Sequence, residues 1–72
     1  MEITSLIGNI STMNNEPYLH LHINVSDQNM NVKGGHLNEC LISATCELVI
    51  TEINGEIDRN LNEEIGLNLI KF

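Results

Sequence analysis

Strict alternation of aliphatic and polar residues is the feature that most limits what this chain can fold into. It is clearest over residues 18–26 (YLHLHINVS), where it runs without a break. A period of two places successive side chains on opposite faces of a β-strand. The pattern therefore predicts a strand with one aliphatic and one polar face, the two faces carrying Leu19, Leu21, Ile23 and Val25, and Tyr18, His20, His22 and Asn24.

The same period predicts further strands over residues 2–10, 44–53 and 67–72. Gly8, inside the first of these, indicates a β-bulge or a close approach of neighbouring backbone. No segment has the pattern of a long amphipathic helix. The residues alone thus favour a turn-rich β architecture.

Turn-forming residues separate the predicted strands. Gly34 and Gly35 predict a shaped loop over residues 32–37, because adjacent glycines allow backbone conformations closed to other residues. The remaining expectations are turns at 13–17 and 27–31, a hairpin turn at Asn54-Gly55, one helical turn or the start of a strand at 38–42, and one helical turn at 60–66.

A chain of 72 residues forms at most one small domain, and its core must come from Ile, Leu and Val because only 3% of the residues are aromatic. Aliphatic strands with no long helix to cover them leave an apolar face and strand edges open. We therefore expect that the chain either oligomerises or forms part of something longer.

The charge balance limits the partners. Three Lys and Arg residues against ten Asp and Glu residues give a formal net charge of −7. This argues against direct contact with nucleic acid or an acidic membrane, since both require clustered cations. The chain has neither a membrane-spanning apolar run nor a signal-peptide pattern, so a cytoplasmic location is expected. Cys40 and Cys46 lack a C-x-x-C spacing and are expected to be reduced, small buried hydrophobic residues rather than metal ligands.

All three histidines fall within seventeen positions. His20 and His22 project from one face of the predicted strand, roughly 6–7 Å apart, and His36 joins them if the Gly-Gly loop folds back beside that strand. Three imidazoles with one open position suit zinc, and also nickel, copper or iron. The alternative is that the histidines are ordinary solvated side chains.

The histidines also lie in a pattern that resembles a known family, the plants-and-prokaryotes-conserved (PPC) domain. The resemblance rests on the spacing H-L-H, thirteen residues, then G-G-H-L, followed by T-x-E and an aliphatic segment. The matching residues are His20-Leu21-His22, Ser26-Asp27, Gly34-Gly35-His36-Leu37, Thr45, Glu47, Ile50, Arg59 and Glu64-Ile65-Gly66-Leu67.

The resemblance implies an α/β (α+β) fold with a largely antiparallel sheet, assembled as a homotrimer. It also implies a bound metal, usually zinc, with His20, His22 and His36 as ligands. Plant members of the family follow AT-hook motifs, and stand-alone prokaryotic members often carry the label of a predicted DNA-binding protein. The family domain is longer, so residues 1–72 are interpreted as a single domain that corresponds to its later, C-terminal portion. Asn29-Met30 stands where the family has an Asp-Gly type of turn.

Two charged residues at matching positions have open roles. Glu47 is either an acceptor for a histidine N–H, a general base for metal-bound water, or a solvated carboxylate. Arg59 either orients an anionic ligand, pairs with Glu47, or forms an ordinary surface ion pair.

The predicted function is that of a metal-binding, oligomer-forming domain, with zinc or another divalent transition metal as the cofactor. Three alternatives stay open: a DNA-associated regulatory protein that acts through a protein partner, a small zinc-dependent hydrolase with Glu47 as base, and an assembly module whose histidines are incidental. The sequence favours a non-enzymatic role without deciding it.

Overall fold

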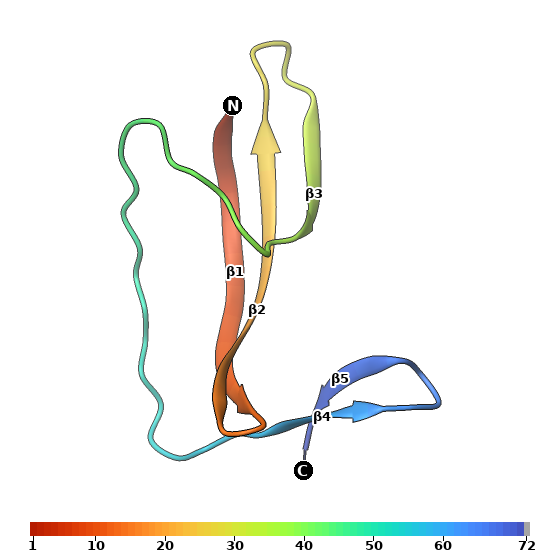
Figure 1. Ribbon diagram of the computed structural model, residues 1–72. Coiled ribbons are helices and arrows are strands. Elements are labelled where there is room, and N and C mark those ends of the chain that lie inside the picture. Colours follow the sequence, from red (N-terminus) through yellow and green to blue (C-terminus); the bar gives the residue numbers. More distant parts are fainter. Residues whose placement is uncertain (72) are drawn as a thin grey trace.

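Five β-strands make up the regular structure of the chain in a computed structural model that describes residues 1–71. They are β1 (Glu2–Met13), β2 (Glu16–Ser26), β3 (Val32–His36), β4 (Arg59–Asn62) and β5 (Leu67–Ile70). The first three form one antiparallel sheet in the order β1-β2-β3, and the last two form a separate antiparallel pair (Figure 1). The expected antiparallel sheet with little helix is confirmed, and none of the described residues forms a helix that could cross a membrane.

β1 and β2 form a long hairpin that extends further than the sequence predicted. The strands pair as far as Met13 and Glu16, so the predicted turn at 13–17 contracts to Asn14 and Asn15. Both asparagines have positive φ, 54° and 64°, as the mirror-image two-residue turns of hairpins require.

Gly8 brings the two strands of this hairpin close together. A Cβ atom there would overlap the carbonyl oxygen of His20 and approach the Cα atom of Leu21. The close approach was predicted correctly, whereas the register shift that marks a bulge lies between Ile3 and Ser5.

The prediction of a loop over residues 32–37 is wrong, because these residues form β3 and pair with β2. Asp27 closes the preceding turn tightly, with its backbone N–H donating to the Asn31 carbonyl oxygen at 3.1 Å. The chain therefore reverses at once, and Gly34 lies against the Asn24 side chain, where a Cβ atom would overlap the amide oxygen.

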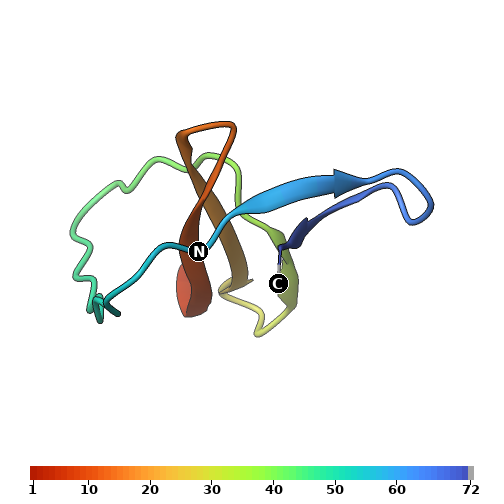
Figure 2. The same ribbon diagram turned by 90° about the horizontal axis from the view of Figure 1, so that it is seen from below.

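The predicted strand at 44–53 is also wrong for this chain. No strand is present between β3 and β4, and no hairpin forms at Asn54-Gly55, where Gly55 has a φ of 118°. Residues 38–42 form neither a helical turn nor a strand. A strand needs a hydrogen-bonded neighbour, which alternation alone does not provide. Figure 2 shows this segment on one side of the three-stranded sheet and the β4–β5 pair on the other.

The β4–β5 pair replaces most of the helical turn predicted at 60–66. β4 occupies residues 59–62, and a single turn ends at Gly66, whose N–H donates to the Asn62 carbonyl oxygen at 2.7 Å. The predicted last strand is confirmed over Leu67–Ile70, and its end, Phe72, lies outside the described residues.

A hydrophobic core is missing from the described part of the chain. No apolar side chain there is fully buried, and the buried side chains are those of Ser11 and Arg59. The radius of gyration is 14.8 Å, compared with about 11 Å for a compact domain of this length. The aliphatic faces expected from the sequence are therefore open.

Candidate metal centre

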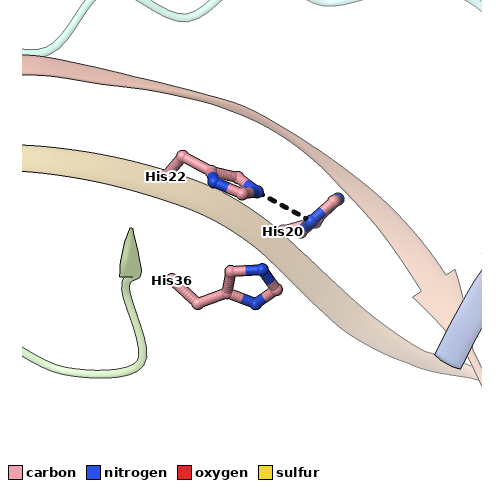
Figure 3. Close-up of side chains that lie close together, drawn as sticks. All are labelled: His20, His22 and His36. Atoms are coloured by element: carbon pink, nitrogen blue, oxygen red, sulfur yellow. Dashed lines mark hydrogen bonds between the residues drawn. The ribbon is translucent and has the colours of Figure 1, made fainter. Parts of the chain in front are cut away.

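Strand register brings the three histidines together. His22 lies directly opposite His36 in the β2–β3 ladder. His20 is two residues along β2 and therefore shares the face of His22. One ring nitrogen from each histidine lies within 4.8 Å of the other two, and Figure 3 shows the rings gathered on one side of β2. The sequence prediction that His36 joins the other two is confirmed, although β3 delivers it in place of a loop.

The spacing of the imidazoles fits a tetrahedral metal ion. The Nε2 atoms of His20 and His22 are 3.2 Å apart, and the ring centroids of His22 and His36 are 4.5 Å apart. Two ligands with Zn–N bonds of about 2.0–2.1 Å in a tetrahedron have nitrogens roughly 3.3–3.4 Å apart. His36 adds the third nitrogen, within 4.8 Å of the other two, so binding of an ion would draw the rings closer together.

The cluster contains imidazoles alone. Among the described residues, no carboxylate or thiol joins the three histidines. Cys40 and Cys46 lie outside the cluster and are exposed, so the prediction that they are buried is wrong. Three protein ligands leave a fourth tetrahedral position to a small molecule, as in zinc sites that accept a ligand.

Arg59 lies beside the cluster and is 7% exposed. Its Nε donates to the Ser11 hydroxyl at 3.0 Å, and its Nη1 donates to the Asn68 carbonyl oxygen at 2.9 Å. Its Nη2 donates to Asn9 Oδ1 at 3.0 Å and lies 3.3 Å from His20 Nδ1. The guanidinium therefore links β4 to β1, β2 and β5. Within the part of the chain that the structure describes, Arg59 forms neither a surface ion pair nor the pairing with Glu47.

The surroundings of His20 favour its neutral form. Desolvation by the surrounding atoms, followed by the positive charge of Arg59 and the neighbouring His22 and His36, lowers the pKa of His20. A neutral imidazole is the form that binds metal ions. Because a guanidinium only donates, His20 Nδ1 accepts the Arg59 hydrogen bond, and the ring proton lies on Nε2, facing His22. Metal binding at Nε2 thus requires that proton to leave or to move to Nδ1.

A pocket of about 190 Å³ opens next to the cluster. Its lining is formed by Tyr18, His20, His36, Arg59, Leu67 and Asn68. The Tyr18 hydroxyl accepts a hydrogen bond from Asn68 Nδ2 at 3.2 Å, and the Arg59 guanidinium lies 5.3 Å from the centre of the Tyr18 ring.

Sequence reasoning did not single out Tyr18, Asn68, Asn9 or Ser11 as site residues. Tyr18 shares the polar face of β2 with His20, and this signal was present in the alternation. Asn9 lies opposite His20 in the β1–β2 register, which the sequence did not reveal.

Glu47 is not brought to the histidines. Its side chain is exposed in the segment between β3 and β4, and it neither belongs to the cluster nor lines the pocket. A base on metal-bound water must lie within hydrogen-bond reach of that water or be one water away from it. The geometry of this chain therefore gives the hydrolase alternative no support.

Comparisons with known proteins identify the family and the fold of this chain. The profile of the Plants and Prokaryotes Conserved (PCC) domain, the family named PPC above, matches residues 1–54. A crystal structure of a protein from Bacteroides thetaiotaomicron VPI-5482, to which DNA binding has been ascribed, is 38% identical with a TM-score of 0.91. The similarity covers 97% of this chain and 50% of that chain, so this chain spans about half the length of its relative. No curated protein gives a significant match.

Proposed function

The chain belongs to the Plants and Prokaryotes Conserved (PCC) domain family, and from that premise we propose that it binds a divalent transition metal ion, with zinc first, through His20, His22 and His36. The observation that supports this most strongly is the gathering of three ring nitrogens within 4.8 Å. Two adjacent strands hold them there, so the donors are arranged before an ion arrives.

The chemistry of the donor set favours zinc. Neutral imidazoles suit Zn²⁺, and the absence of carboxylates from the cluster within residues 1–71 disfavours Mg²⁺ and Ca²⁺, which prefer oxygen ligands. Bound zinc would supply a Lewis acid with one exchangeable position. The protein's own contribution is to hold three ligands on β2 and β3 and to keep that position open toward the pocket.

Elemental analysis of the purified chain tests this proposal. We expect about one zinc per chain in the wild type and a loss of at least tenfold in His20→Ala/His22→Ala. A Cys40→Ser/Cys46→Ser variant is the matched control, because it removes the alternative soft ligands and should retain the metal. Equal metal content in the wild type and the histidine variant would refute the ligand assignment.

We also propose that the domain assembles as a homotrimer. The support from this chain is the lack of a buried apolar side chain among residues 1–71, together with large exposed aliphatic residues such as Val49, which is 98% exposed. Such surfaces are normally covered by another protein surface. A cytoplasmic location remains a prediction from the sequence.

A DNA-associated role is a second candidate, because DNA binding has been ascribed to the crystallised relative. Of the three cationic side chains, Arg59 is buried, which leaves Lys33 and Lys71 to meet phosphates. We therefore propose that any such role runs through a protein partner. Gel shifts at low salt should detect no binding of DNA by the chain alone, whereas a shift that weakens steeply with salt would show direct contact.

A further inference from the structure

We propose that the pocket beside the histidines binds a small carboxylate anion, which bridges the metal's open position and Arg59. This inference rests on the proposed metal site and adds the chemical class of its ligand. It is argued from the burial and charge of Arg59, the free hydrogen-bond donors of the pocket, and the pocket's size.

Among residues 1–71, the buried charge of Arg59 has no counter-ion. Its four partners are a serine hydroxyl, an asparagine side-chain oxygen, a backbone carbonyl and an imidazole, all of them neutral. The chain has ten acidic side chains, yet none of them bonds to Arg59 or lines the pocket in the part that the structure describes. Burial of a cation without an opposite charge is expensive and is usually offset by pairing.

Two hydrogen-bond donors of the pocket, one N–H of Arg59 and the Tyr18 hydroxyl, have no acceptor among the described residues. A guanidinium has five N–H groups, and Arg59 uses four, so one Nη1 hydrogen has no partner among the described residues. The Tyr18 oxygen accepts from Asn68, so its own hydroxyl proton is free to donate. Both residues line the same pocket, which therefore offers hydrogen-bond donors and no carboxylate.

The proposed divalent metal ion adds a second cation to this side of the pocket. His20 contacts Arg59 and, with His36, lines the pocket, so the ion and the guanidinium would be neighbours. Two like charges in a partly desolvated site repel, and an anion between them converts that repulsion into attraction.

The apolar wall of the pocket favours a carboxylate over a phosphate. A volume of about 190 Å³ suits a ligand of a few heavy atoms, and Leu67 provides an apolar wall for a short carbon chain. Inorganic phosphate has no carbon chain to place against Leu67 and would leave polar oxygens against it. Carboxylate oxygens are established zinc ligands at about 2.0–2.2 Å.

Absorption spectroscopy of the full chain loaded with Co²⁺ tests the inference, because the visible bands of Co²⁺ respond to a change of ligand. Acetate and propionate are the probes, and phosphate is the comparison arm. We expect saturable spectral changes with both carboxylates and at least tenfold weaker binding of phosphate. Arg59→Gln should weaken acetate binding at least tenfold, and Tyr18→Phe, a milder change that keeps the ring, should weaken it severalfold.

The possible failures are distinguishable. If Co²⁺ binds but the carboxylates leave the spectrum unchanged, the anion site is refuted while the metal site stands. If phosphate binds more tightly than acetate, the assigned ligand class is wrong. If Co²⁺ itself does not bind, the metal proposal fails and the anion proposal fails with it. If Arg59→Gln does not fold, unchanged acetate affinity in Tyr18→Phe still contradicts the proposed contacts.

Discussion

Single residues in the turn between β2 and β3 determine where His36 lies. Asp27 Oδ1 accepts hydrogen bonds from the backbone N–H groups of Asn29, at 2.8 Å, and Asn31, at 3.0 Å. Met30, in the same turn, has a φ of 64°. The hydrogen bonds to Asp27 stabilise the turn. The positive φ of Met30 strains it, because the Cβ atom of such a residue lies too close to its own backbone.

Met30→Gly should stabilise the chain. Glycine adopts positive φ without the steric penalty, so we expect a gain of about 1 kcal/mol, measured as a higher midpoint of urea unfolding. Gln28→Gly is the matched control, since Gln28 is not among the positive-φ residues and should gain nothing. An equal effect of the two changes would contradict the strain at Met30.

Asp27 should make the stability of the fold decrease at acidic pH. The hydrogen bond from the Asn31 backbone, before all other contributions, lowers the pKa of Asp27. A lowered folded-state pKa means that the carboxylate stabilises the fold above its unfolded pKa of about 4, and that this stability is lost as pH falls through the folded value. Between about pH 5 and pH 3, the urea midpoint should fall further for the wild type than for Asp27→Asn. Parallel declines would show that Asp27 does not contribute.

At the scale of strands, the structure separates what alternation predicts from what it does not. Residues 18–26 were predicted as a strand because their period is strict, and β2 confirms it. Residues 44–53 have a similar period but form no strand, since the structure gives them no hydrogen-bonded neighbour. The Gly34-Gly35 pair was interpreted as a loop because glycine permits turns, yet it pairs with β2. Local pattern thus predicts which residues can extend, and pairing decides which of them become strands.

The common face of His20 and His22 could be predicted from local spacing, whereas the Arg59 pocket depends on a long-range contact and could not. The i, i+2 spacing of His20 and His22 fixes their common face from sequence alone. Arg59 reaches them only because the β4–β5 pair lies against the turn end of the β1–β2 hairpin, where the Thr12 N–H donates to the Ile57 carbonyl oxygen at 2.9 Å. No local pattern in the sequence encodes that long-range contact.

Gly8→Ala should weaken the pairing of β1 with β2 and thereby disturb the histidine cluster. The added Cβ would meet backbone atoms of His20 and Leu21, which cannot rotate away, so we expect a loss of about 1–3 kcal/mol and weaker zinc binding. Gly35→Ala is the control, because no atom lies within 4 Å of its Cβ position. Denaturant unfolding and a competitive zinc titration compare the two variants, and equal behaviour would contradict the close approach at Gly8.

For the molecule as a whole, the open aliphatic faces are the dominant property. A stable domain normally buries such residues, and residues 1–71 bury none completely. The family resemblance implies three copies, so light scattering should give a mass of about three times the 8.1 kDa of the chain. Val49→Asp should lower that mass, whereas Glu52→Gln, a nearby polar change, should not. A monomeric wild type would refute the assembly proposal.

The central claim is that three imidazoles hold one metal ion, and X-ray absorption at the zinc edge tests it most directly. The full chain loaded with one equivalent of zinc should show about three imidazole nitrogens and one further light atom near 2.0 Å. A sulfur shell near 2.3 Å, or a signal from one imidazole only, would contradict the assignment of His20, His22 and His36 as the ligands.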